Sequence, residues 1–373
     1  MWTLAIKTLV ADRGKLLTAL VGVVFAVVLV NVQGGLFLGL IAKASLLVDH
    51  GEADVWVGHK EMDNVDFPGD IPRRWLYRVR AVPGVAHAEP YLIGHSTMTL
   101  PGGGFEPVLL VGSPPEGRLG GAWNLREGAV NSVRRTDGVI VDAHDADKLR
   151  DPQVGDRREI GGRRARVVGR SEGILGFLVT PYVFTTLDAA AEYLGKPADV
   201  CSYILVAVEP GAEAELVAAE IVRRLPEVDA YPAAVYGRMS VAYWLRRTGL
   251  GISFGAATLL GLTVGLVIVA QTLYAMVLDR LGEFGTLKAI GASEGQVYHI
   301  VFVQAVTMAL AGSLLGLVAV HLVQAAFSTP RAPIAVPWWL SLGSCTLVTA
   351  ICVLASWLPY QRIRRVDPMM VMP

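Results

Sequence analysis

The sequence predicts an α-helical membrane protein with four transmembrane helices and a large extracytoplasmic α+β domain inserted between the first and the second helix. Hydrophobic residues make up 53% of the chain and charged residues only 18%, and the mean hydropathy is +0.47. These values are typical of a chain that is partly membrane-embedded and partly water-soluble. Uncharged apolar runs near both ends are long enough to cross a bilayer, whereas segment 43–247 has the mixed composition of a globular domain.

Residues 1–15 are predicted to form a cytoplasmic amphipathic segment, followed by transmembrane helix 1 at 16–42. The apolar side chains of the first segment can share one helix face: Trp2, Ile6, Leu9 and Val10. Such a segment either lies at the membrane interface or is a simple charged flank of the first span. No charged residue interrupts 16–42, whose length is sufficient for about 30 Å of hydrocarbon. Lys7, Arg13 and Lys15 favour a cytoplasmic N-terminus.

Segment 43–247 is predicted to fold outside the cytoplasm as one α+β body that contains two βαβ units. The first unit comprises a strand at 53–58, a helix at 72–82 and a strand at 85–90. The second unit comprises a strand at 203–208, a helix at 212–225 and a strand at 228–231. The ends of the two helices align, RAVPGV with RRLPEV, and we interpret the two units as an internal echo.

A β-rich subdomain is predicted between the two units, at about 92–184, because short β-prone runs alternate there with Gly and Pro turns. Two stretches of this subdomain allow more than one interpretation. The arginine-rich run 157–170 is either a solvated strand face, which we favour, or a contact surface for an anionic group or a partner protein. The apolar run 172–179 is either a buried strand, which we favour, or an exposed loop that contacts lipid or a partner.

Three further transmembrane helices are predicted, at 248–278, 297–330 and 332–361. A cytoplasmic segment at 279–296 connects the first two of these, and a cytoplasmic tail at 362–373 follows the last. The arginines of the tail favour this orientation under the positive-inside rule. Arg246 and Arg247, at the outer end of the second span, run against that rule, although long external domains largely escape it.

Pairs of glycines spaced four residues apart predict close packing of the membrane helices. The pairs are Gly35 and Gly39, Gly251 and Gly255, Gly261 and Gly265, and Gly312 and Gly316. They favour either a helical bundle or a seam between two copies of the chain. No span carries a charged residue at its centre, which argues against an ion channel or a proton relay. Four uncharged polar residues of the spans are expected to form hydrogen bonds between helices and not to line a pore: Asn31, Gln33, Gln271 and Gln304.

Segment 279–296, DRLGEFGTLKAIGASEGQ, is too polar and too rich in glycine to continue either neighbouring span. Leu281, Phe284, Leu287 and Ile290 recur every three residues, and this spacing predicts an apolar stripe on one side of a short helix. Gly291 occupies the position of a left-handed C-terminal cap, and Ser293 with Gln296 matches a capping box. We expect Phe284 and Leu287 to insert into a groove of another protein.

The same segment resembles the cytoplasmic coupling segment of MacB/FtsX-type ABC transporter permeases, and is most similar to that of the stand-alone DevC-like permeases. The resemblance is carried by Arg280, Glu283, Phe284, Gly285, Leu287, Lys288, Ala289, Ile290, Gly291, Ala292 and Ser293. It implies a multi-pass protein of the bacterial inner membrane that docks a separate cytoplasmic ABC ATPase. The docking residues that it implies are Arg280, Leu281, Glu283, Phe284, Gly285, Leu287, Lys288, Ile290, Gly291 and Ala292.

The resemblance also implies a function. In such permeases, ATP-driven motion of the ATPase is transmitted to the extracytoplasmic domain, a process called mechanotransmission, and two copies of the permease form a homodimer. DevC-like members export a lipid or another amphiphile together with a periplasmic adaptor protein and an outer-membrane channel, so membrane lipids are expected partners. One alternative is an FtsX-like regulator of an extracytoplasmic partner such as a cell-wall hydrolase. Another is a membrane-anchored sensor or scaffold.

The chain has no residue pattern that indicates an enzyme. It contains no phosphate-binding loop and no nucleophile elbow, HExxH or paired-cysteine motif. We therefore expect a non-catalytic subunit that binds no cofactor or metal itself, with ATP and Mg²⁺ bound by the partner ATPase. The formal net charge is zero and no basic patch suggests binding to nucleic acid.

Overall fold

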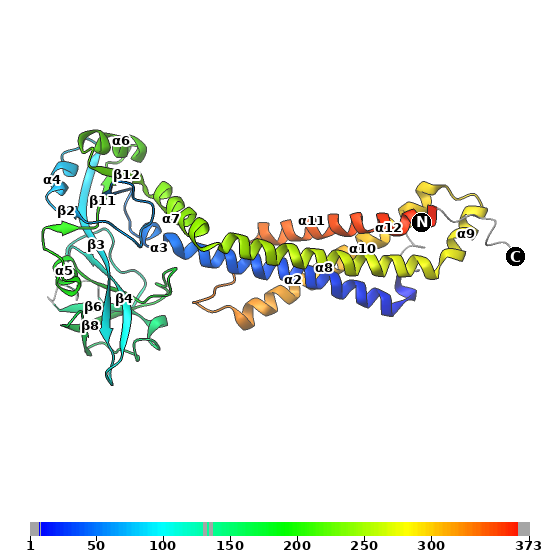
Figure 1. Ribbon diagram of the computed structural model, residues 1–373, viewed down its shortest axis with the longest axis horizontal. Coiled ribbons are helices and arrows are strands. Elements are labelled where there is room, and N and C mark those ends of the chain that lie inside the picture. Colours follow the sequence, from blue (N-terminus) through cyan, green and yellow to red (C-terminus); the bar gives the residue numbers. More distant parts are fainter. Residues whose placement is uncertain (1–6, 8, 130–132, 134–136, 365–373) are drawn as a thin grey trace. The chain divides into compact units, whose positions relative to one another are not determined.

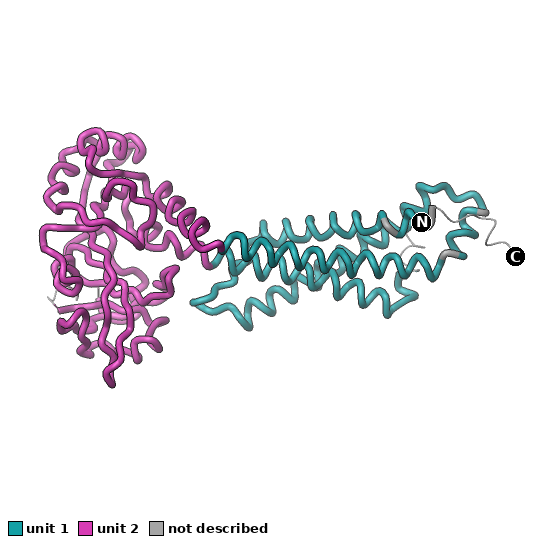
Figure 2. The backbone as a smooth tube through the Cα atoms, viewed as in Figure 1, with its two compact units in different colours: residues 1–39, 250–373 teal, residues 40–249 magenta. Residues whose placement is uncertain are grey.

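The computed structural model describes residues 7, 9–129, 133 and 137–364, and the chain separates into two compact units (Figure 2). Unit 1 comprises residues 1–39 and 250–373, and unit 2 comprises residues 40–249. The boundaries fall near the end of the first apolar run and at the start of the second, where the composition of the sequence changes.

Unit 1 is helical (Figure 1). Its helices are α2 (Arg13–Ile41), α8 (Leu250–Asp279), α9 (Leu281–Ala289), α10 (Glu294–Phe327), α11 (Trp338–Ala355) and α12 (Trp357–Arg364). Among the described residues, 4 helical segments have the length and apolar composition needed to cross a membrane: Arg13–Asp49, Leu250–Asp279, Glu294–Phe327 and Trp338–Gln361. The α-helical fold class with four transmembrane helices is therefore confirmed.

The bounds of the last two predicted spans need correction. Helix α10 begins at Glu294 and ends at Phe327, and residues 328–337 are not helical although they were assigned to the ends of the spans 297–330 and 332–361. Prolines explain the error, because a proline removes a backbone donor and disfavours helical geometry in the residue before it. Pro337 is the N-cap of α11, so the fourth helix starts only at Trp338.

Three of the four predicted glycine pairs pack within the chain, two of them between membrane helices and one, Gly35 and Gly39, against the non-helical residues 333–336. A β-carbon on Gly312 would lie 2.5 Å from Cγ1 of Val23, and one on Gly316 would lie 2.8 Å from Cβ of Val27. Neighbouring side chains or backbone also occupy the space beside Gly35, Gly39, Gly261 and Gly265. These glycines therefore pack within one copy of the chain, where a larger residue would displace the neighbouring helix or, at Gly35 and Gly39, the neighbouring loop.

A buried polar contact joins α2 to α11. Asn31 is fully buried, and its Nδ2 donates to Oγ of Ser344 at 2.7 Å and to the carbonyl of Val27 at 2.8 Å. The prediction that Asn31 bonds between helices is confirmed. Because a buried amide without a partner is costly in an apolar environment, this contact also favours one relative orientation of the two helices.

Unit 2 begins with a mixed α/β layer. Its strands are β1 (Val55–His59), β11 (Tyr203–Val208), β12 (Val228–Pro232) and the first half of β3 (Val85–Thr99), in the order β12-β1-β11-β3. The two predicted βαβ units are present as β1-α4-β3, with α4 at Trp75–Arg80, and β11-α6-β12, with α6 at Ala214–Arg224. They interleave in space, because β11 lies between β1 and β3, and β1 lies between β11 and β12.

Both faces of this sheet are covered. Successive side chains of β1 point to opposite faces, and most of them are buried. Val55 and Val57 pack in a core with residues of α4 and α6. Trp56, between them, points to the opposite face and packs against Tyr236 of α7 (Ala233–Thr248) and Leu47 of α3 (Leu46–Asp49). Short elements complete this half of the unit: the 3₁₀ helix η1 (Ala42–Ser45) and the paired strands β2 (Ile71–Pro72) and β10 (Val200–Cys201).

The predicted β-rich subdomain is a closed ring of strands. Its members are the second half of β3, β4 (Phe105–Ser113), β9 (Tyr182–Thr186), β6 (Gly138–Asp142), β8 (Arg163–Ser171) and β7 (Arg157–Ile160), which pairs back to β3. Strand β5 (Leu125–Gly128) pairs with β8 outside the ring, the 3₁₀ helix η3 (Ala143–Asp145) follows β6, and α5 (Leu187–Leu194) follows β9. Met98, Val108, Ile160, Ala165 and Val167 fill its interior. Closure leaves few strand edges unpaired.

The sequence left two interpretations open for each of two stretches. The structure agrees with the preferred interpretation of the first stretch and contradicts that of the second. In the run 157–170, Ala165 and Val167 point into the ring and Arg157, Arg164 and Arg166 point outward, as expected of a solvated strand face. The preferred interpretation of 172–179 as a buried strand is wrong. Ile174 and Leu175 are buried, but the chain then turns and exposes Leu178 and Val179.

Candidate functional site

The segment between α8 and α10 is a rigid helical turn. After α8 ends at Asp279, Arg280 is the N-cap of α9, and the helix closes at Ile290. Gly291 has φ +102°, a left-handed conformation that favours glycine. Ser293 then starts α10 with a capping box, in which its Oγ accepts from the Gln296 amide at 3.3 Å and its own amide donates to Oε1 of Gln296 at 2.9 Å. The predicted left-handed cap after α9 and the predicted capping box at the start of α10 are both confirmed.

The apolar side chains of α9 do not form the predicted stripe. Phe284 is only 6% exposed and Leu287 is half-buried, whereas Ile290 is 80% exposed. The reason is the pitch of the α-helix: each step of three residues turns about 300°, so a strict three-residue spacing drifts by about 60° per step around the axis. The expectation that Phe284 inserts into another protein is therefore wrong, and Ile290 is the apolar side chain available for contact.

Phe284 instead anchors α9 to both neighbouring membrane helices. It packs in one cluster with Val277 of α8 and with Val297, Ile300 and Val301 of α10. Leu287 and Ala292 pack against the same cluster. The residues on α10 have the three- and four-residue spacing of one helix face. This spacing is present in the sequence, but it could not identify the contact face because nearly all residues of the span are apolar.

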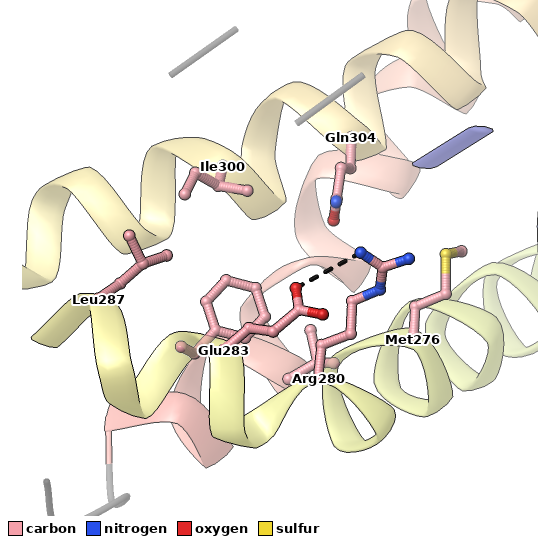
Figure 3. Close-up of a pocket in the computed structure, with 8 residues that line it drawn as sticks. Met276, Arg280, Glu283, Leu287, Ile300 and Gln304 are labelled. Atoms are coloured by element: carbon pink, nitrogen blue, oxygen red, sulfur yellow. Dashed lines mark hydrogen bonds and ion pairs between the residues drawn. The ribbon is translucent and has the colours of Figure 1, made fainter. Parts of the chain in front are cut away.

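A cavity of about 160 Å³ lies beside this anchor (Figure 3). Its apolar walls include Met276, Phe284 and Ile300, and its polar side chains are Arg280, Glu283 and Gln304. Nη1 of Arg280 lies 3.5 Å from Oε2 of Glu283, and Figure 3 shows the amide of Gln304 directed toward the same guanidinium. Residues of α8, α9 and α10 therefore meet around one space, so a shift of α9 changes contacts on both spans.

The predicted docking residues are split between two sides of the turn. Glu283, Ile290 and Gly291 are exposed, Gly285 is buried like Phe284, and the half-buried members of the set are Arg280, Leu287, Lys288 and Ala292. The side chains of Leu281 and Ala289 lie outside the described residues. In the described part of the segment, the outward surface carries the large apolar side chain of Ile290.

The N-terminus of α2 and the C-terminus of α8 lie at the same end of unit 1. Lys15 forms an ion pair with Asp279, the last residue of α8, and another with Asp12 at 3.3 Å. The ends of the first and second spans can adjoin in this way only if both face the same side of the membrane, as the predicted topology requires.

One glycine pair does not pack within the chain. A β-carbon on Gly255 would meet nothing within 4 Å, and Gly251 is also exposed. Both line a groove of about 380 Å³ together with Phe37, Phe254 and Leu259, among other residues of α2 and α8. The sequence could not separate this pair from the other three, because all share the same spacing.

The sequence matches two family models: "MacB-like periplasmic core domain" over residues 16–224 and "FtsX-like permease C-terminal" over residues 255–368. An uncharacterized ABC transporter permease of Mycobacterium tuberculosis is 27% identical over 357 residues, which cover 93% of this chain and 91% of the relative. An uncharacterized ABC transporter permease of Mycobacterium bovis is 26% identical over 373 residues, which cover 95% of each chain.

Solved structures of outer domains also match. The periplasmic region of MacB from Actinobacillus actinomycetemcomitans aligns with a TM-score of 0.40 and 8% identity, covering 50% of this chain and 93% of that one. The extracellular domain of the noncanonic ABC-type transporter YknZ from Gram-positive bacteria aligns with a TM-score of 0.36 and 14% identity, covering 48% of this chain and 98% of that one.

Proposed function

Because the chain belongs to the MacB/FtsX family of ABC transporter permeases, multi-pass proteins of the bacterial inner membrane, we propose that it couples a separate cytoplasmic ATPase to its extracytoplasmic domain. The ATPase binds ATP and Mg²⁺ and docks on the turn 279–296. Its motion tilts the membrane helices, and these move unit 2 outside the membrane. The chain itself performs no chemistry.

The observation that carries this proposal is the exposure of Ile290 at the tip of a capped turn. Among the described side chains of the turn, Ile290 is the large apolar one that is exposed on an otherwise polar surface, which is typical of an anchor residue at a protein interface. Gly291 and the capping box of Ser293 hold the tip in one conformation, so little ordering entropy is lost on docking.

Transmission of force is supported by the packing behind the tip. Phe284 contacts Val277 of α8 and Val301 of α10 in one buried cluster. Close-packed side chains are poorly compressible, so displacement of α9 displaces both spans. Helix α8 continues the chain from α7 of unit 2, which gives this motion a covalent path to the extracytoplasmic domain.

A second copy of the chain is the proposed occupant of the groove beside Gly251 and Gly255. Small residues on a lipid-facing helix surface allow another helix to approach closely. A β-carbon on Gly255 would meet nothing within 4 Å, and Gly251 is exposed. The proposed assembly is a homodimer of permeases with one ATPase on each.

The proposed cargo is a lipid or another amphiphile, passed to a periplasmic adaptor protein and an outer-membrane channel. Support comes from the spans, which carry no charged side chain at their centres and so offer no polar pathway. Unit 2, with its own cores, provides the surface on which cargo and adaptor are handled.

The test is ATP hydrolysis in reconstituted membranes. The chain alone should show no hydrolysis above a mock purification. A candidate ABC ATPase from the same organism should show a basal rate, and the two together should show a rate that responds to the permease. The purified adaptor should change that rate further if export is the function. A response to a cell-wall hydrolase in place of the adaptor would identify an FtsX-like regulator, and no response of the ATPase to the permease would refute coupling.

A further inference from the structure

Helix α7 carries two arginines to the membrane surface that the coupling mechanism does not use. Arg246 and Arg247 occupy its last turn and are exposed, and Gly249 follows with φ +64° before α8 begins at Leu250. Since a residue spans at most about 3.5 Å, both arginines lie within about 15 Å of the start of the span. This distance keeps them close to the outer end of the second span, on the side where the positive-inside rule does not favour them.

The two arginines form one end of a groove on the surface of unit 2. The groove has a volume of about 400 Å³ and is lined by Asp63, Met239, Ala242, Tyr243, Arg246 and Arg247. Met239, Ala242, Tyr243 and Arg246 follow the three- and four-residue spacing of one face of α7. The guanidinium of Arg247 lies 5.4 Å from the centre of the Tyr243 ring, which holds it beside the groove.

Asp63 is the only acidic side chain among the residues that line this groove, and the loop that carries it is fixed. Its neighbours Met62 and Asn64 are each only 1% exposed, so Asp63 projects between two buried residues. The amide of Val65 donates to Oγ of Ser240 on α7 at 3.3 Å, which ties the loop to the helix. The groove is therefore lined by two positively charged side chains and one negatively charged side chain, together with the apolar side chains of Met239 and Ala242.

Apolar and aromatic side chains surround the same part of unit 2. Phe67 and Phe177 pack on Trp244, with ring centres 5.8 and 4.4 Å away. Phe67 is partly exposed, and the loop after Phe177 exposes Leu178 and Val179. Exposed aliphatic side chains, ring clusters and arginines occurring together are typical of a protein surface that lies in the membrane interface.

We propose that this groove binds the headgroup of a zwitterionic phospholipid of the outer leaflet, phosphatidylethanolamine, with its phosphate on Arg246 and Arg247 and its ammonium group on Asp63. Arginine matches phosphate through paired N–H donors, and the carboxylate matches the ammonium group. The glycerol and the first methylenes of the acyl chains lie on Met239 and Ala242. The bound lipid holds the last turn of α7 against the membrane, at the joint through which motion passes between α8 and unit 2. The inference rests on the proposed orientation, in which unit 2 is extracytoplasmic.

The test measures lipid retention by the full-length chain. The protein is reconstituted in nanodiscs of equal parts phosphatidylethanolamine, phosphatidylglycerol and phosphatidylcholine, extracted in mild detergent, and its bound lipids are quantified by native mass spectrometry. The wild type should retain phosphatidylethanolamine at least about fivefold over phosphatidylglycerol, because only the former satisfies Asp63. The double variant Arg246→Ala/Arg247→Ala should lose most bound lipid of both classes.

Two single variants make the result specific. Asp63→Asn removes the partner of the ammonium group but keeps both arginines, so the preference for phosphatidylethanolamine over phosphatidylglycerol should disappear while total retention stays. Arg238→Ala is the matched control, because Arg238 is exposed on the same helix but does not line the groove, and retention should match the wild type. An unchanged lipid ratio in Asp63→Asn, or an equal loss in Arg238→Ala, overturns the inference. Neither readout involves the ATPase, so the lipid site and the coupling function fail independently.

Discussion

Phe284 and Ile290 belong to the same short apolar pattern of the turn, yet Phe284 is 6% exposed and Ile290 is 80% exposed. The first side chain fastens the turn to α8 and α10, and the second is free to contact a partner. Substitution of Phe284 is therefore expected to affect the stability of the permease, and substitution of Ile290 is expected to affect binding of the partner. The sequence pattern alone does not distinguish these two effects.

Ile290→Asp should weaken docking of the ATPase without loss of the fold. Loss of an apolar anchor at an interface costs about 2 kcal/mol or more, which corresponds to roughly 30-fold in affinity, and an unpaired carboxylate in a dry contact adds to this cost. Binding of the purified ATPase to the permease in nanodiscs measures the effect. Ile290→Leu is the control and should bind nearly as the wild type does. Equal binding by Ile290→Asp and Ile290→Leu would show that the tip is not the docking anchor.

Phe284→Ala should act on the permease itself. Truncating a buried phenylalanine typically costs about 3 kcal/mol or more, and here it would detach α9 from Val277 and Val301. The expected result is increased proteolysis within the turn and a lower melting temperature of the isolated permease, before any ATPase is added. If stability is unchanged and only ATPase binding falls, Phe284 contacts the partner after all.

Substitution of two glycines on α8 should give opposite results. A β-carbon on Gly265 would lie 2.7 Å from Cβ of Ala26, so Gly265→Leu should impair packing of α2 against α8 and lower the yield of folded protein. Gly255 has open space on its outer side, so Gly255→Leu should fold normally but dimerise less. Mass determination by light scattering, with thermal stability as the control, distinguishes them. A stable dimer of Gly255→Leu would place the seam elsewhere.

Asp66 should make the stability of the outer domain depend on pH. Burial raises the pKa of its carboxyl from 3.8 to about 6, although Nε1 of Trp244 at 3.2 Å and the Tyr182 hydroxyl at 3.3 Å donate to it. Between these values the folded chain holds a proton that the unfolded chain has released. The stabilisation is therefore present below about pH 4 and is lost as the pH rises through about 6, a change of up to about 3 kcal/mol.

Asp66→Asn should remove this contribution. Urea unfolding of the full-length chain in detergent, followed by near-ultraviolet circular dichroism, gives the free energy of unfolding at each pH. His95, whose pKa is lowered by burial although a hydrogen bond to the backbone of Asp66 opposes this, titrates in both proteins. The difference between variant and wild type should change between pH 4 and 7 in favour of the variant. A difference that is constant over this range would mean that Asp66 is already ionised in the folded protein at pH 4.

A reporter inserted after Gly103 should be active only outside the cytoplasm. Gly102 and Gly103 form an exposed hairpin tip between β3 and β4, with φ +97° and +92° and no neighbour within 4 Å, so an insertion there disturbs little. Alkaline phosphatase at this site should be active, and a fluorescent protein that matures only in the cytoplasm should be dark. The reverse pattern would overturn the orientation of unit 2 and the lipid site with it.

The sequence by itself determined the classes of structure in this protein. Uncharged runs such as 16–42 must leave water and predict membrane helices, and β-prone runs divided by turns predict the β-rich part of unit 2, because these properties depend on local composition. The caps at Gly291 and Ser293 were also predictable, since a cap requires only a few adjacent residues.

Only the tertiary structure decided which side chains face a neighbour. Of four glycine pairs with the same spacing, three pack within the chain and one lines an open groove. The apolar pattern of the turn is divided between the buried Phe284 and the exposed Ile290. Asp63 lies far from Arg246 and Arg247 in the sequence, but all three line one groove. They meet because the loop after β1 is hydrogen-bonded to α7. The spacing of residues in the sequence shows which side chains share one face of a helix, but not what that face contacts. The direction in which that face points is set by contacts between segments distant in the chain.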